Sequence, residues 1–179
     1  CAVKEKRLEC VEFLVENGAL VNPPLEKPQC EFSLIHFTLI ADNYLVGEQP
    51  ITAFHQACHN NSIEMVSLFL AKGIDINLRG DKNKIALHYA ASNPNPSLPF
   101  FEFMLNKGAD PNLLSDKSKK GGRTVLAAFL HPGTWRGFES KRMIFEFLLD
   151  HGADVRLELQ CNLLAGLFKY HPLLFWIIK

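Results

Sequence analysis

An amphipathic stretch that ends in glycine occurs four times in this chain and constrains its fold more than any other feature. The four stretches are Val11–Asn22, Met65–Asn77, Phe101–Asn112 and Ile144–Arg156, and their glycines are Gly18, Gly73, Gly108 and Gly152. A glycine in that place adopts the left-handed conformation that closes a helix. The Asp and Asn residues that follow are turn formers. The repetition predicts stacked helical units, in which each unit buries its apolar face against its neighbours.

A second pattern precedes three of these helices. It reads TAFHQAC at Thr52–Cys58, IALHYAA at Ile85–Ala91 and TVLAAF at Thr124–Phe129. Small residues stand where two helices must approach closely, and Thr52 is a natural helix N-cap.

Together the two patterns resemble the ankyrin repeat, in which TPLHxA opens the first helix and GADxN ends the second. The first motif survives here as Thr52, Phe54, His55 and Ala57, and again as Leu87, His88 and Ala90. The resemblance implies an all-α, ankyrin-type solenoid of about four to five stacked helix-turn-helix repeats with irregular insertions.

The spacing of the glycines shows where the array is irregular. From Gly18 to Gly73, Gly108 and Gly152 the steps are 55, 35 and 44 residues, against about 33 for an ankyrin unit. Ser33–Ala41 resembles a first helix, but no glycine-terminated second helix follows it before Thr52. We therefore treat residues 1–179 as a single array. It begins with the second helix of a partial repeat (1–22) and a degenerate repeat or insertion (23–51). A regular repeat (52–84), a repeat (85–123), a repeat with an inserted loop (124–161) and a terminal partial repeat (162–179) follow.

Composition and charge narrow the class of protein. The formal net charge is zero and 47% of residues are hydrophobic, so no overall basic field attracts nucleic acid. Five scattered cysteines without a CxxC pair indicate reduced thiols in a cytoplasmic or nuclear protein. The chain lacks an initial Met and shows no signal peptide, so we expect a fragment or a processed chain. The apolar stretch Cys161–Lys179 is either the core of a terminal repeat, which would self-associate if left uncovered, or the start of a membrane segment.

Motifs that could carry chemistry have structural interpretations here. His55 and His59 have a spacing that zinc sites use, but Gln56 stands where a metalloprotease has its general base. The resemblance instead implies that His55, His36 and His88 are the histidines of the repeat motif, which bond to neighbouring loop backbone. Cys58 falls at a helix contact, where a buried, inert thiol is favoured over a nucleophile. We predict no enzyme activity, no cofactor and no metal site.

Two loops hold residues with a functional alternative. Lys117, Lys119, Lys120 and Arg123 form either a solvated loop or a patch for an acidic partner surface or a phosphate-bearing ligand. Trp135 and Phe138, flanked by Arg136 and Arg142, are either a binding hot spot or an insertion that covers its own helices.

The resemblance implies a non-catalytic protein-protein interaction module, an adaptor, scaffold or targeting array, that binds a protein through loop tips and first helices. The alternative is the cytosolic ankyrin domain of a larger membrane protein or multidomain enzyme, in which the membrane is reached only through a C-terminal continuation. We expect no nucleic-acid partner. The residues predicted to contact the partner are Gln56, His59, Asn60, Arg79, Asp81, Lys82, Lys84, Tyr89, Ser92, Arg123, Trp135, Arg136 and Phe138.

Overall fold

The computed structural model of the chain describes residues 7–17, 52–115, 122–129 and 138–157. Every regular element in these ranges is helical, as the sequence predicts. In chain order the elements are α1 (Leu8–Glu16), α3 (Ala53–His59), α4 (Ile63–Ala71), the short turn η1 (Asp81–Asn83), α5 (Ala86–Ala91), α6 (Leu98–Asn106), α7 (Val125–Phe129) and α8 (Phe138–Asp150). Gly18, the segment Ser33–Ala41 and the C-terminal stretch Cys161–Lys179 lie outside the described residues.

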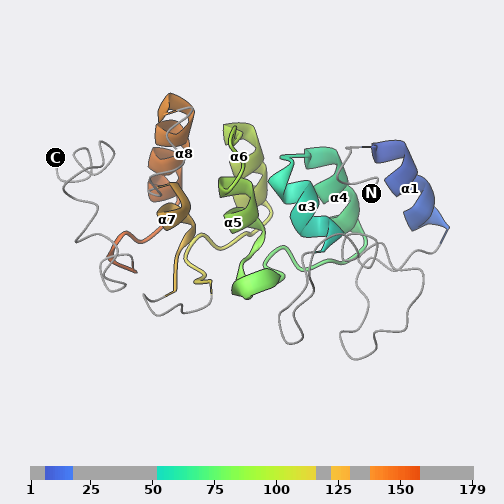
Figure 1. Cartoon of the computed structure of the whole chain (residues 1–179), viewed down its shortest axis with the longest axis horizontal. Helices are drawn as coiled ribbons and strands as arrows, with labels where there is room; N and C mark the ends of the chain where they lie inside the picture. The colour runs from blue at the N-terminus through green and yellow to red at the C-terminus, as the bar shows by residue number, and fades with distance from the viewer. Residues whose placement is uncertain (1–6, 18–51, 116–121, 130–137, 158–179) are drawn as a thin grey trace.

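The helices follow one another along the long axis of the molecule, from α1 at one end to α7 and α8 at the other (Figure 1). Each first helix packs against its second helix, as α3 does with α4, α5 with α6 and α7 with α8. First helices also contact one another, α3 with α5 and α5 with α7, while α1 contacts α4 and α6 contacts α8. The result is two adjacent rows of helices, the arrangement of a solenoid.

The second helices end where the glycine pattern predicts. Gly73, Gly108 and Gly152 have φ values of 86°, 92° and 89°, in the left-handed region. At the end of α4, the Ile74 N–H donates to the Phe69 carbonyl at 3.3 Å, and the Gly73 N–H donates to the carbonyl three residues back at 3.0 Å. This pair of bonds is the Schellman motif, and the same pair closes α6 and α8. Each glycine therefore turns the chain away from the second helix toward a loop tip.

Aromatic rings fill the space between the two rows. Phe54 on α3 meets Phe69 on α4 edge to face, with ring centroids 6.5 Å apart. Phe101 on α6 meets Phe129 on α7 at 5.7 Å, so one ring pair joins two successive helix pairs. Small buried residues let the first helices approach, as the sequence predicts: Ala53, Ala57 and Cys58 on α3, and Ala86, Ala90 and Ala91 on α5.

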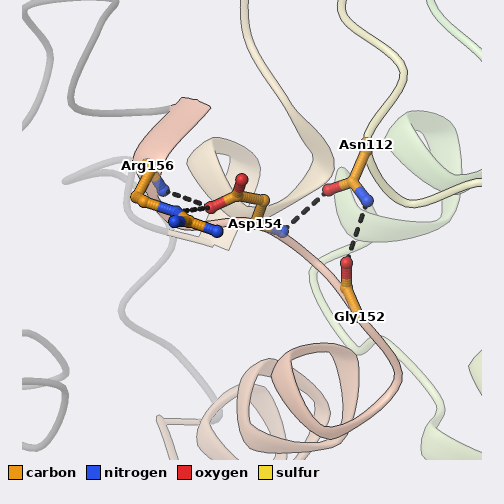
Figure 2. A network of polar contacts seen from close by, with 4 residues as sticks. All are labelled: Asn112, Gly152, Asp154 and Arg156. Atoms are coloured by element: carbon orange, nitrogen blue, oxygen red, sulfur yellow. Dashed lines mark hydrogen bonds and ion pairs between the residues drawn. The ribbon is translucent and has the colours of Figure 1, made fainter.

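Asparagine side chains connect each loop to the next. The Asn112 side chain donates to the Gly152 carbonyl at 2.9 Å and accepts from the Asp154 N–H at 2.7 Å (Figure 2). Asn77 makes the same two bonds one unit earlier, to Gly108 at 3.3 Å and from Asp110 at 3.0 Å. Both asparagines make these two bonds, although Gly108 and Gly152 are 44 residues apart and Gly73 and Gly108 only 35. The additional residues are therefore accommodated away from this connection. Arg156 stands at the next asparagine position and pairs with Asp154 instead, at 3.1 Å (Figure 2).

We expect Asn112→Ala to lower the free energy of unfolding by roughly 1–3 kcal/mol, because it removes two hydrogen bonds and leaves backbone groups of Gly152 and Asp154 without this partner. Urea unfolding followed by circular dichroism measures the change. Asn106→Ala is the matched control, because Asn106 is exposed at the end of α6 and alanine is a better helix former. Equal losses in the two variants would contradict a connecting role for Asn112.

Candidate functional site

The loop tip between α4 and α5 is a tight, hydrogen-bonded turn. The Lys84 N–H donates to the Asp81 carbonyl at 3.1 Å, and the Gly80 N–H donates to the Lys84 carbonyl at 2.8 Å. The two central residues are left-handed, with φ of 53° at Lys82 and 57° at Asn83. Two successive left-handed residues enclosed by the hydrogen bond from the Lys84 N–H to the Asp81 carbonyl form a type I′ turn. The turn places the exposed Lys82 at the end of the tip.

Gly80 lets this tip pack closely against the first helices. A Cβ atom at Gly80 would lie 2.8 Å from the His55 ring and 2.9 Å from the Tyr89 hydroxyl. No larger residue fits without displacing one of these rings. The tip therefore rests on α3 and α5 and is part of the packed structure.

His55 connects the start of α3 to this loop. Its Nδ1 accepts from the Thr52 N–H at 3.3 Å and lies 2.9 Å from the Thr52 hydroxyl. The Thr52 side chain in turn accepts from the His55 N–H, which makes the predicted N-cap. On the other side of the ring, Nε2 donates to the Leu78 carbonyl at 2.9 Å. Because both ring nitrogens are engaged, neither is left for a metal ion.

His88 repeats the arrangement one unit later. Its Nδ1 accepts from the Ile85 N–H at 3.3 Å, and its Nε2 donates to the Arg123 carbonyl at 2.9 Å. Ile85 has replaced the threonine of the motif, so the hydroxyl cap of α5 is missing while the histidine bond to the next loop is retained.

Burial keeps both histidines neutral at physiological pH. Desolvation lowers the pKa of His55 to about 4, although its bond to the Leu78 carbonyl opposes the shift. Desolvation also lowers the pKa of His88 to about 4. The bond to the Arg123 carbonyl opposes that shift, and the charges of Lys84 and Arg79 add to it. The position of the loop tips therefore depends on two uncharged imidazoles.

Arg79 connects one loop tip to the next. Its Nη1 donates to the Asn83 carbonyl at 3.0 Å and to the Leu114 carbonyl at 2.8 Å. The neighbouring Ser115 N–H donates to the Arg123 carbonyl at 3.0 Å, and the Arg123 N–H donates to the Ser115 hydroxyl at 3.2 Å. Two tips that are far apart in the sequence thus form one hydrogen-bonded unit.

Tyr89 lies inside this unit. It is 6% exposed, its hydroxyl donates to the Asp81 carbonyl at 3.4 Å, and its ring centroid is 4.7 Å from that of His55. Burial raises the pKa of the phenol, and Asp81 adds to the shift. The sequence predicts Tyr89 as a partner contact. The structure instead gives the ring a packing role, because the tip folds back over α5, and we leave Tyr89 out of the face proposed below.

Some of the polar residues predicted on the first helices form hydrogen bonds to residues nearby in the chain. Gln56 donates to the Asn60 side chain at 3.2 Å, and the Ser92 hydroxyl donates to the His88 carbonyl at 2.7 Å. His59 is half-buried, and its carbonyl accepts from the Asn93 side chain. Gln56, His59 and Asn60 lie on or next to α3, and Ser92 is exposed at the end of α5.

Helix pairs joined by glycine stops, motif histidines and asparagine connections point to a single repeat family. Residues 29–115 match the family described as ankyrin repeats, in three copies. The chain contains ankyrin repeats. No curated protein sequence shows significant similarity to the chain. Ankyrin repeats form protein-binding modules and are typically non-catalytic, so a protein partner is implied in general terms.

Within the described ranges, the possible metal ligands are not clustered and the candidate nucleophile Cys58 is buried. These ranges contain no group of three or more His, Cys, Asp or Glu residues that could hold a metal ion. Cys58 is fully buried, and burial raises the pKa of its thiol well above the ordinary value, which disfavours the reactive thiolate. No helix in the described part of the chain is long and apolar enough to cross a membrane.

Several of the predicted loop residues lie outside the described ranges. Trp135 and Arg136, together with Lys117, Lys119 and Lys120, lie outside the described residues. Phe138 begins α8, but its side chain is not among those described.

Sequence analysis missed one surface feature, a cleft of about 480 Å³ beside the second helices α4 and α6. Five of its seven lining residues are apolar, and the full set is Ser67, Leu70, Ala71, Ile74, Ile76, Phe103 and Lys107. No local motif signals such a cleft, because it depends on how far apart two second helices lie.

Proposed function

We propose that this chain is a non-catalytic recognition module that binds a protein partner through one face, the tip face. The tip face combines the loop tips with the exposed side of the first helices: Gln56, His59, Asn60, Arg79, Asp81, Lys82, Lys84, Ser92 and Arg123. The observation that carries the proposal is the fixed loop tip, in which Lys82 is held outward by the type I′ turn, the close packing of Gly80 and the clamp from Arg79.

A fixed tip favours binding because little conformational freedom is lost when the partner arrives. A flexible loop loses backbone and side-chain entropy when it binds. The free-energy cost is roughly 0.5–1.5 kcal/mol for each long side chain that becomes immobilised. Here the backbone around Lys82 is already held by three backbone hydrogen bonds within residues 80–84 and by one bond from Arg79 to the Asn83 carbonyl. The mixed polar and charged character of the tip face is typical of the rim of non-obligate protein interfaces.

We further propose an adaptor or scaffold role in the cytoplasm or nucleus. Among the described residues, Cys10 and Cys58 are both unpaired thiols, as expected in a reducing compartment. No nucleic-acid partner is proposed for the module, since its overall net charge is zero.

A pair of matched variants tests the function. Gln56→Trp with Ser92→Trp places two bulky neutral rings on the tip face, while Ser67→Trp with Ala71→Trp places two on α4 along the cleft. We expect partner capture from cell extract, quantified by mass spectrometry, to fall about tenfold for the first variant and to stay within about twofold of wild type for the second.

Matching helical circular dichroism spectra and unfolding midpoints are the control for both variants. Loss confined to the α4 variant would move the binding surface to the cleft. Undiminished capture by both variants, or no specific capture by the wild type, would refute the proposed face.

A further inference from the structure

The two joined loop tips carry an excess of positive charge that the fold does not neutralise. Their described residues are 78–84, 113–115 and 122–124, and these contain four basic side chains but only one acidic one, Asp81. The basic residues, here called the basic tip cluster, are Arg79, Lys82, Lys84 and Arg123. The whole chain has zero formal net charge, so the excess is local to this surface.

Contacts of Arg79, Arg123 and Lys84 hold the two tips together, and Lys82 lies in the same turn as Lys84. Arg79 bonds to Asn83 and Leu114, one on each tip. Arg123 pairs with Ser115, the residue next to Leu114. Lys84 follows Asn83, and its Nζ lies 5.8 Å from the centre of the Tyr89 ring. The charges of Arg79 and Lys84 both act on His88, whose ring is bonded to Arg123.

Within the described residues no carboxylate forms an ion pair with the cluster, and Asp81 offsets only one of its four charges. The ion pairs of that part of the chain involve Arg142 and Arg156, and none involves a member of the basic tip cluster. The groups that Arg79 binds are backbone carbonyls, which carry no net charge. A rigid surface with several uncompensated cations is complementary to an anionic ligand.

From this arrangement we propose that the partner presents an acidic segment, rich in Asp and Glu, that lies across the basic tip cluster. The proposal rests on the proposed function and names the chemistry of the partner at that face. A protein segment is favoured over nucleic acid because Tyr89 is packed beneath the tip, whereas single-stranded nucleic acids are bound by exposed aromatic rings on which bases stack. The cluster is also small compared with the basic grooves that follow a phosphate backbone.

A peptide titration tests the proposal directly. The probe is a fluorescein-labelled decapeptide of alternating Glu and Gly, with a Gln–Gly decapeptide as the uncharged reference and a labelled dT10 oligonucleotide as the nucleic-acid reference. Fluorescence anisotropy at low salt gives Kd for each. We expect the acidic peptide to bind, the Gln–Gly peptide not to bind, and the acidic peptide to weaken as salt is raised.

The variant Lys82→Asn with Lys84→Gln removes two charges of the cluster, and asparagine suits the left-handed backbone at position 82. The control is Lys72→Gln with Lys107→Gln, because both lysines are exposed at the ends of α4 and α6. Lys107 also lies over an aromatic ring, that of Phe103, at 5.9 Å, as Lys84 does over Tyr89. We expect Kd for the acidic peptide to rise about tenfold in the tip variant and to stay within about twofold in the control.

Each other outcome overturns the proposal. Equal weakening in both variants would mean a general charge effect. Tighter binding of dT10 than of the peptide, lost in the tip variant, would indicate nucleic acid. Absence of peptide binding would refute the acidic segment. The proposed function would still stand if the variant Gln56→Trp with Ser92→Trp captured about tenfold less of a protein partner than wild type.

Discussion

Lowering the pH from 6.5 to 5 is expected to reduce the free energy of unfolding by about 1.6 kcal/mol for each of His55 and His88, and lowering it to pH 4 by roughly 2.6 kcal/mol for each. Both imidazoles have a folded pKa of about 4, below the ordinary value of 6.5. The unfolded chain therefore binds more protons in this range, so the stabilisation is complete above pH 6.5 and is lost as pH falls toward 4. Urea unfolding at a series of pH values measures the effect.

The physical cause is burial, so removing the two rings should flatten the profile. His55→Gln with His88→Gln is expected to be less stable than wild type at pH 7 but to change little between pH 6.5 and 5. His151→Gln serves as the control, because it removes an exposed imidazole and keeps His55 and His88. A wild-type profile that is level from pH 6.5 to 5 would show that these histidines are not held neutral.

Truncating Phe101 to alanine should cost about 3–5 kcal/mol of unfolding free energy, the range for a fully buried phenylalanine. Its side chain is 0% exposed. It meets Phe100 edge to face at 6.5 Å and Phe129 at 5.7 Å. In a solenoid, stability depends strongly on contacts between neighbouring units, and this ring joins α6 to α7. Chemical denaturation of Phe101→Ala, followed by circular dichroism, gives the change.

Phe103→Ala is the matched comparison, since it removes the same atoms from the same helix. Phe103 is half-buried and lines the cleft beside α4, so we expect less than half the loss seen at Phe101. A broadened unfolding transition for Phe101→Ala would further show that the helix pairs have become less coupled. Similar losses in both variants would mean that the Phe101–Phe129 contact carries no special weight.

The basic tip cluster connects stability to the proposed binding. Arg79 stabilises the tips through backbone carbonyls while its charge remains part of the cluster. Acid that protonates His55 and His88 should therefore loosen the surface that the acidic partner is proposed to contact. Binding of the Glu–Gly peptide is expected to weaken below about pH 5 in wild type for this reason, in addition to the neutralisation of the peptide itself.

Signals within a few residues determined much of this fold. The glycines at 73, 108 and 152 end their helices because only a left-handed residue closes a Schellman motif easily. Thr52 caps α3 because its hydroxyl reaches the N–H three residues on. His55 and His88 bond to loop backbone, as the resemblance to ankyrin repeats implies. Lys82, Lys84 and Asp81 lie at a loop tip, where the sequence puts them.

Tertiary structure decided what those residues can do. Tyr89 is buried because a tip that begins eleven residues earlier, at Leu78, folds back over α5, and no local pattern specifies that approach. Arg79 becomes a clamp because Leu114, 35 residues away, presents its carbonyl. Asn112 reaches Asp154 across 42 residues, over a step whose length the repeat does not predict. Caps and turns depend on neighbours in the chain, whereas burial and charge clustering depend on which units pack together.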